Sequence, residues 1–336
     1  MIYFLLSILN SVLYFNFSKL SKILNIYDKP DGKLKIHNIK TPLLGGVIFF
    51  LNFILISFFQ LAFSDDFLML KKTFFIKEEI ISIIFFVTIF FMIGLYDDKN
   101  NISPYTKLFI VIISSIILLF LNKNLIVQNF LLSFYDNQIF LNKFSIFFTI
   151  FCIVILTNSL NFYDGINGQS GNIYIIVFSY LYFKSDFNYF YLIIILPLIF
   201  VLVLNLYNKL FFGDCGVYLI SSIMIICLIY EHNISKNIIY ADEIFFLFLL
   251  PGLDLVRLTI ARLFLNKNIF YGDRNHFHHY LTKKFDLTVS NILLISFNLI
   301  PIIFLSLGVN FYYILFSYLI VYFSFLYYLM NPKDEI

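Results

Sequence analysis

Two adjacent aspartates, Asp97 and Asp98, have the clearest capacity for chemistry in this 336-residue chain. They lie in the stretch GLYDDKNNISPYTK, where one long apolar run ends and another begins at Lys107. Neighbouring carboxylates repel each other, so a pair held in place usually has a cation to bind, either Mg²⁺ or a lysine such as Lys99. Mg²⁺ in turn suits phosphate-bearing substrates. The alternative is a solvated loop between two spans, and four further polar stretches on the same side favour the functional interpretation.

The stretch NSLNFYDGINGQSG contains amides and no basic residue. Asn158, Asn161 and Asp164 fall at i, i+3 and i+6, so on a continuing helix they would share roughly one face. An amide both donates and accepts hydrogen bonds, which suits a nucleobase or a sugar. We therefore favour binding of a polar substrate over a plain polar loop.

The stretch NLYNKLFFGDCG runs from Asn205 to the start of another apolar run. Asp214 is flanked there by Gly213 and Gly216, at the beginning of a predicted helix. A carboxylate at this position suits a metal ligand beside an anion-binding helix end. A simple capping aspartate is the alternative.

The last polar stretch runs from PGLDLVRLTIAR to GDRNHFHHYL. Asp254 and Arg257 lie inside an apolar run, where each charge costs at least about 2.5 kcal/mol on insertion scales, so we expect them to pair or to face a polar cavity. Five more candidates follow in GDRNHFHHYL: Asp273, Arg274, His276, His278 and His279. Phosphate contacts fit these side chains better than a transition-metal site, because no matching cysteine set is present. The first polar loop, DKPDGKLKIHNIKTPLLGG, adds His37 and four lysines, which favour anionic lipid heads or serve as topogenic charge.

Membrane spans must position these stretches, because the chain is 61% hydrophobic and 13% charged. Its net charge of +3 gives no reason to expect a nucleic-acid partner, and its three cysteines have no CxxC spacing. We predict an all-α, polytopic membrane bundle forming a single domain over residues 1–336. Eleven apolar runs are long enough to be predicted spans: 1–18, 43–63, 80–96, 107–121, 144–160, 171–183, 187–206, 216–230, 244–264, 290–308 and 311–330.

The distribution of basic residues predicts the orientation. Sixteen Lys and Arg lie on the odd-numbered loops and the C-terminus and seven on the even-numbered loops, which accounts for all 23. Cytoplasmic loops carry the excess of Lys and Arg, so the N-terminus is predicted outside and the C-terminus in the cytoplasm. All five polar stretches then face the cytoplasm, and the outer loops read as plain connectors.

In chain order, the motifs HxxxTPLLGG, GLYDD…K, NxxNFYDGxxG, FFGDCG, DLVR and DRNHFHH resemble those of the polyprenyl-phosphate N-acetylhexosamine-1-phosphate transferases of glycosyl transferase family 4. The resemblance implies a multi-pass enzyme of the bacterial inner membrane with a cytoplasmic active site. Such an enzyme moves a sugar-1-phosphate from a UDP-N-acetylhexosamine to a polyprenyl phosphate such as undecaprenyl phosphate. UMP is released and a cell-surface glycan is started. The HxHH ending and the eleven spans resemble the GlcNAc-1-phosphate branch, with phospho-N-acetylmuramoyl-pentapeptide transferase as the alternative.

The resemblance also implies roles for individual residues. Asp97 and Asp98 match the catalytic pair near the lipid phosphate, with Lys107 beside them. Asp214 matches the Mg²⁺ ligand, Asp98 is a second candidate ligand, and Mn²⁺ is an alternative ion. The expected substrate-binding residues are His37, Asn158, Asn161, Asp164, Asn205, Asp254, Arg257, Asp273, Arg274, His276, His278 and His279. Membrane lipids are expected partners, and a homodimer is compatible with the sequence.

Three mechanisms remain open on the residues alone. We favour direct attack of the lipid phosphate on the β-phosphorus of the nucleotide sugar, because positioning and charge neutralisation supply most of the rate in phosphoryl transfer. A covalent aspartyl intermediate is the competing scheme. A secondary transporter with an intramembrane Asp254–Arg257 pair is a third interpretation, but it would place polar groups near the midplane rather than at one face.

Overall fold

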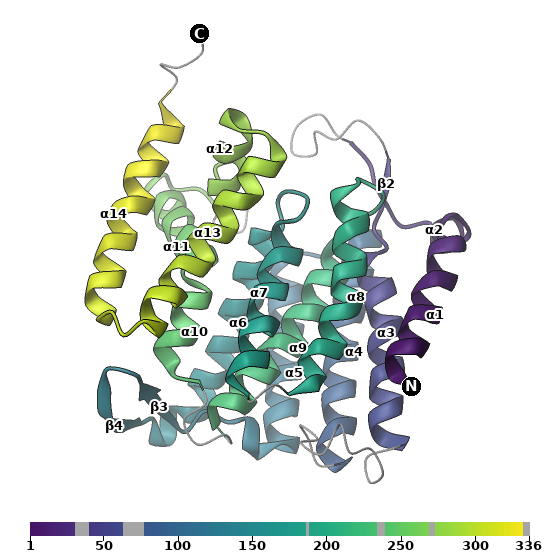
Figure 1. The fold of residues 1–336 in the computed structure, drawn as a ribbon, viewed down its shortest axis with the longest axis horizontal. Helices are drawn as coiled ribbons and strands as arrows, with labels where there is room; N and C mark the ends of the chain where they lie inside the picture. Colours follow the sequence, from purple (N-terminus) through teal and green to yellow (C-terminus); the bar gives the residue numbers. More distant parts are fainter. Residues whose placement is uncertain (31–39, 63–76, 186–187, 234–238, 269–272, 332–336) are drawn as a thin grey trace.

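The computed structural model describes residues 1–30, 40–62, 77–185, 188–233, 239–268 and 273–331. Long helices run side by side across the molecule, and short connecting elements lie at the two ends (Figure 1). The helices are α1 Ile2–Phe15, α2 Phe17–Leu24, α3 Gly45–Ala62, α4 Lys77–Asn100, α5 Pro104–Leu121, α6 Ser145–Tyr163, α7 Gln169–Lys184, α8 Tyr189–Leu206, α9 Gly213–Asn233, α10 Ala241–Leu247, α11 Leu249–Phe264, α12 Phe277–Lys284, α13 Leu287–Ser306 and α14 Phe311–Met330. Two 3₁₀ turns cover Lys123–Leu125 and Asn142–Phe144.

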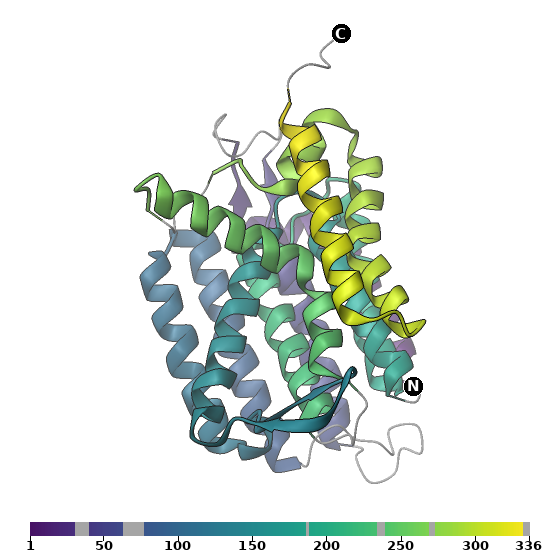
Figure 2. The ribbon, with the colours of Figure 1, turned by 90° about the vertical axis from the view of Figure 1, so that its left-hand side faces the viewer.

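The polytopic helical class is confirmed, and each of the eleven predicted runs contains helix. Within the described residues, eight helices are long and apolar enough to cross a membrane. Two expected spans form shorter helices, α1 with 14 residues and α7 with 16. The predicted span 244–264 consists of two helices, because α10 and α11 meet at a bend of 69°; the pair together is apolar enough to form one broken span or a re-entrant segment. Figure 2 shows α11 crossing the direction of the other helices at a large angle.

Helix α9 is the centre of the bundle. Of its most apolar window, 89% is buried inside the protein, which is the highest value among the eight candidate spans. Helices α3, α4, α6 and α7 all contact it. Helix α4 approaches it closely at Gly94, where a Cβ would overlap the backbone of Asp214 and Cys215. Glycine at this position lets α4 lie directly against the start of α9.

Two small antiparallel sheets depart from the all-α expectation. Strands β1 (Tyr27–Asp28) and β2 (Thr41–Pro42) pair near the start of α9. The segment before α9 continues this pairing, because the Phe211 amide donates to the Pro42 carbonyl and the Gly45 amide donates to the Phe211 carbonyl. Strands β3 (Asn129–Leu132) and β4 (Tyr135–Phe140) form a hairpin at the opposite end of the bundle (Figure 1).

Candidate functional site

A cavity of about 1130 Å³ lies at the end of the bundle that carries β1, β2 and the start of α9. Its walls come from segments that are far apart in the sequence. The predicted site residues that line it are Asp97, Asp98, Asp164, Asn205, Asp214, Arg274 and His279. The cavity therefore joins four of the five polar stretches through these residues. Lys29 and Lys40 add the fifth, the first loop, to the same lining.

Helix ends place the acidic residues and their lysine. Helix α4 extends to Asn100, so Asp97 and Asp98 lie in its last turn rather than in the expected loop. Asn101 then adopts a left-handed conformation, with a φ of 52°, that ends the helix. Helix α5 begins at Pro104, and the Ser103 side chain accepts a hydrogen bond from the Thr106 amide at 3.2 Å. Lys107 consequently lies in the first turn of α5, opposite Asp97.

Lys107 bridges two of the three acids. Its Nζ forms an ion pair with Asp97 Oδ2 and a second one, at 3.0 Å, with Asp214 Oδ2. The other oxygen of Asp97 accepts the Ile102 amide at 2.6 Å. The Lys107 side chain is 15% exposed and the Asp97 side chain 10%, so water screens this pair weakly. The expectation that a lysine or a metal must balance the aspartate pair is met here by Lys107.

Asp98 serves the start of α9. Its two carboxylate oxygens accept the backbone amides of Asp214 at 2.8 Å and Cys215 at 3.0 Å. These amides have no partner within α9 because they belong to its first turn, and a negative charge there is favourable. Gly213 has a φ of +71°, and a Cβ at this position would meet the Asp98 carboxylate. The GLYDD and FFGD motifs are thus two halves of one contact.

The acidic group fits a hard divalent cation. When all three are ionised, Asp97, Asp98 and Asp214 carry three negative charges against the single positive charge of Lys107, and carboxylate oxygens are the ligands that Mg²⁺ prefers. The Lys107 ammonium already occupies the place of a metal ion between Asp97 and Asp214. Both oxygens of Asp98 accept backbone amides, whereas Asp97 and Asp214 each contact the Lys107 ammonium, whose place a metal ion could take. Asp97 and Asp214 are therefore the better placed ligands.

Amide side chains form another wall of the cavity. Asn205 Oδ1 accepts the Gly168 amide at 2.7 Å, and Asn205 Nδ2 donates to the Leu210 carbonyl at 3.0 Å. Asn167 Nδ2 donates to Asn208 Oδ1 at 2.5 Å. Asn208 lines the cavity but was not among the predicted site residues, although it lies in the same polar stretch as Asn205. Its left-handed φ of 55°, which asparagine tolerates, is the local feature that marks the turn.

The expected shared face of Asn158, Asn161 and Asp164 is only partly correct. Helix α6 ends at Tyr163, so Asp164 leaves the helix and lines the cavity, whereas neither Asn158 nor Asn161 does. Asn158 donates instead to the Val154 carbonyl of its own helix at 2.7 Å. Asp164 Oδ1 accepts the Ser170 hydroxyl at 2.7 Å. Burial raises the pKa of Asp164 to about 6, because desolvation disfavours the ionised carboxyl.

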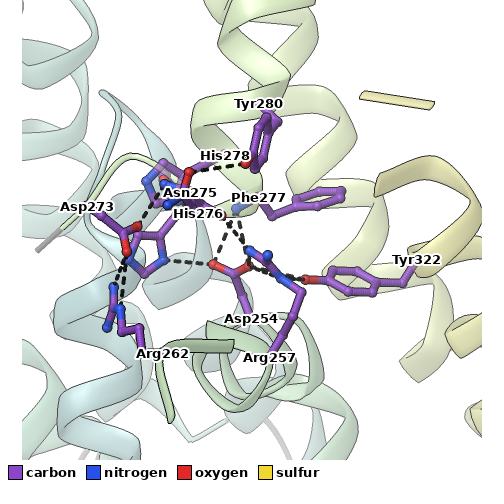
Figure 3. A network of polar contacts seen from close by, with 11 residues as sticks. Asp254, Arg257, Arg262, Asp273, Asn275, His276, Phe277, His278, Tyr280 and Tyr322 are labelled. Carbon is purple, nitrogen blue, oxygen red and sulfur yellow. Dashed lines mark hydrogen bonds and ion pairs between the residues drawn. The ribbon is translucent and has the colours of Figure 1, made fainter. Parts of the chain in front are cut away.

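Asp254 and Arg257 pair, as expected, at 2.6 Å, but neither residue lines the cavity. Figure 3 shows Asp254 of α11 facing the start of α12 and Tyr322 of α14. It accepts His276 Nδ1 at 2.8 Å, the Phe277 amide at 3.2 Å and the Tyr322 hydroxyl at 3.2 Å. Nothing in the local sequence marks Tyr322, which belongs to the apolar helix α14.

The ligand atoms of Asp254, His276 and His278 lie within 4.8 Å of one another, as they would in a metal site. Two features favour an internal hydrogen-bond network instead. The His276 and His278 rings are stacked, with 9° between their planes and 5.3 Å between centroids. An imidazole nitrogen binds a metal in the plane of its ring, so two stacked parallel rings do not converge on one ion. Moreover, both Asp254 oxygens already have partners.

The three histidines of the last motif have different surroundings. His279 lines the cavity with Arg274, whereas His276 and His278 are buried behind it. Burial, with Arg274 and His276 nearby, lowers the pKa of His279 to about 4, so its ring is neutral at pH 7. The Gln169 side chain lies 3.2 Å from His278 Nδ1, and a Cβ at Gly165 would overlap the His278 ring.

Asp273 and His37 are the two remaining predicted residues. Asp273 accepts a hydrogen bond from Arg262 Nε at 3.1 Å, and another of its oxygens accepts the Asn275 amide at 2.8 Å. Arg262 is 4% exposed, so this pair ties the loop before α12 to α11. His37 lies outside the described residues.

Residues 80–232 match the family model described as glycosyl transferase family 4. The chain is similar to the phospho-N-acetylmuramoyl-pentapeptide-transferase of Petrotoga mobilis, with 29% identity over 271 residues, 74% of this chain and 78% of that protein. It is also similar to the protein of the same name from Streptococcus pneumoniae serotype 2, with 25% identity over 187 residues, 53% of each chain.

Proposed function

This chain belongs to glycosyl transferase family 4, the polyprenyl-phosphate sugar-phosphate transferases, and we propose from this membership that it transfers an N-acetylhexosamine-1-phosphate from a UDP-sugar to undecaprenyl phosphate or a similar polyprenyl phosphate. UMP is the second product, and the lipid-linked sugar starts a cell-surface glycan such as an O-antigen. The observation that carries the proposal is the single cavity shared by Asp97, Asp214, Asp164, Arg274 and His279.

Each wall of the cavity suits one part of this reaction. Asp97 and Asp214 would hold Mg²⁺ or Mn²⁺, which when bound would neutralise charge on the diphosphate of the nucleotide sugar. Arg274 and the neutral His279 ring can donate hydrogen bonds to phosphate oxygens. The amide wall of Asn167, Asn205 and Asn208 is suited to the nucleoside or the sugar.

Proton transfer is a small part of this mechanism. The second pKa of a phosphate monoester is near 6, so about 90% of the lipid phosphate is dianionic at pH 7. Asp97 therefore needs only to orient the lipid phosphate or accept a residual proton, and Lys107 holds the Asp97 carboxylate toward Asp214. Trapping a sugar-phosphoryl enzyme in the absence of lipid acceptor would refute this direct attack in favour of an aspartyl intermediate.

A second candidate substrate is favoured by the names of the relatives. Both are phospho-N-acetylmuramoyl-pentapeptide-transferases, so UDP-N-acetylmuramoyl-pentapeptide is the alternative donor. The HxHH motif favours the smaller UDP-N-acetylhexosamine by resemblance. A transporter is disfavoured, because the polar cavity lies at one end of the bundle rather than across it.

The direct test supplies the purified full-length protein with undecaprenyl phosphate, Mg²⁺ and a panel of UDP-sugars that includes the muramoyl-pentapeptide donor. Mass spectrometry of the lipid products identifies the sugar, and UMP release gives the rate. We expect a lipid diphosphate carrying one N-acetylhexosamine, abolished by Asp214→Ala. Counterflow of labelled substrate in vesicles without any lipid product would contradict the proposal.

The proposed setting is the bacterial inner membrane, with the cavity open to the cytoplasm. The excess of Lys and Arg on this side of the sequence supports it. A cysteine introduced at exposed Lys99, at the cavity rim, should react with a membrane-impermeant maleimide only after cells are opened. Labelling in intact spheroplasts would contradict the orientation.

A further inference from the structure

Helix α12 is short and carries groups that the cavity depends on. It has eight residues, Phe277–Lys284, and His279 and Thr282 on it line the cavity, as does Arg274 just before it. Its N-cap residue, His276, makes no side-chain cap. An eight-residue helix is too short to be stable alone, so neighbouring elements must fix its position.

Asp254 and Arg257 of α11 bind the start of α12 at three consecutive residues. Arg257 Nη2 donates to the Asn275 carbonyl at 2.6 Å. Asp254 accepts His276 Nδ1 at 2.8 Å and the Phe277 amide at 3.2 Å, which gives α12 the anionic cap that its own sequence lacks.

Tyr322 of α14 completes this contact from the other side. It is fully buried, and its hydroxyl donates to Asp254 Oδ1 at 3.2 Å. The Tyr322 hydroxyl oxygen also accepts a hydrogen bond from Arg257 Nε at 3.2 Å. Its ring stacks on Phe277, with centroids 5.1 Å apart (Figure 3). At the far end of α12, Lys284 Nζ donates to the Tyr328 carbonyl of α14 at 2.8 Å. Both ends of α12 are therefore attached to α14.

We propose that Tyr322 is a positioning residue of the active site. Through Tyr322, helix α14 fixes the position of α12 and so orients Arg274 and His279 toward the cavity. Tyr322 contacts Asp254, Arg257 and Phe277, none of which lines the cavity. It acts by keeping the Asp254 carboxylate and the Arg257 guanidinium in the orientation that binds residues 275–277. Helix α14 lies outside the stretch 80–232 that matches the family model, so this role belongs to a part of the chain that the family match does not describe.

The experiment compares Tyr322→Phe with Tyr327→Phe in the full-length protein in detergent micelles. Tyr322→Phe removes only the hydroxyl and keeps the ring on Phe277. Tyr327 lies on the same helix with 70% exposure and serves as the matched control. Hydrogen–deuterium exchange of the peptide covering 274–284 measures the hold on α12, and KM for the UDP-sugar measures its effect on the cavity. The kinetic readout rests on the proposed function, whereas the exchange readout does not.

We expect Tyr322→Phe to speed exchange in this peptide and to raise KM by about three- to ten-fold, the scale of one typical hydrogen bond. The control should match the wild type, and Asp254→Asn should give the larger effect. Exchange equal to the control would overturn the proposal, and so would faster exchange with an unchanged KM. A wild-type protein without transferase activity would refute the proposed function instead, while exchange still decides whether Tyr322 holds α12.

Discussion

Replacement of Asp98 by asparagine should destabilise the protein far more than the same replacement at Asp97, although the two residues are adjacent. Asp98 accepts two backbone amides of the first turn of α9, at 2.8 and 3.0 Å. Asparagine has one carbonyl oxygen, so one of those amides would face an NH₂ group. The loss of one hydrogen bond to a charged acceptor, with the loss of the charge at the helix start, costs about 2–4 kcal/mol.

Asp97→Asn should spare the fold. Its Oδ1 contact with the Ile102 amide can be kept by an amide oxygen, and Lys107 keeps its ion pair with Asp214 at 3.0 Å. The substitution does remove the charge that we assign to orienting the lipid phosphate. Transfer should therefore fall by about 10²-fold or more, the usual scale for a positioned group.

The assay is thermal unfolding of both purified variants in the same detergent, together with UMP release. At roughly 2 °C per kcal/mol for a chain of this size, Asp98→Asn should lower Tm by roughly 4–8 °C. Asp97→Asn should stay within about a quarter of that shift. An Asp98→Asn protein with the Tm of the wild type would refute the capping role and return Asp98 to the metal or catalytic role expected from the sequence.

Three further predictions concern the same cavity. Gly94→Ala would push α4 away from the backbone of Asp214 and Cys215, so it should lower the free energy of unfolding by about 1–3 kcal/mol and reduce UMP release. Gly252→Ala is the control and should match the wild type, because a Cβ at Gly252 meets nothing within 4 Å. Lys107→Met removes the cation that shares the Asp97 and Asp214 carboxylates, so Mn²⁺ should bind more tightly in calorimetry, and weaker binding would contradict the role of Lys107 as a stand-in cation. The pKa of Asp164 is raised to about 6 in the folded protein. Between pH about 4 and 6 the Asp164 carboxyl is therefore ionised in the unfolded chain but still protonated in the folded one, so the stability of the wild type falls as pH rises. Asp164→Asn should lack this component when Tm is followed across the same pH range, and an unchanged slope would contradict the burial of Asp164.

Local patterns in the sequence were enough to find seven of the residues that line the cavity. Asp97, Asp98, Arg274 and His279 lie near the ends of apolar runs, and all four line one cavity. They could be recognised because carboxylates, amides and imidazoles interrupt the apolar pattern at the ends of predicted spans. Asn158 and Asn161 show the limit of that reasoning, because helical spacing alone does not reveal that α6 ends at Tyr163 and turns Asp164 away from them.

Residues in apolar helices had no such signal. Tyr322 is one of 24 tyrosines, and nothing in its local sequence distinguishes it from exposed Tyr327. Its role follows only from the packing of α14 on α12, which places its hydroxyl beside Asp254. Likewise, Asp254 was expected to contact substrate, whereas the fold uses both of its oxygens for Arg257, Tyr322 and the start of α12.

The sequence by itself determined that this protein is a bundle of membrane helices with its polar chemistry gathered at one end, because hydropathy and charge are properties of the chain that need no partner. Only the tertiary structure decided which of two neighbouring aspartates faces Lys107 and which caps α9. That choice depends on how closely α4 approaches α9, and the approach is set by Gly94 and by the backbone of Asp214 and Cys215, more than a hundred residues away.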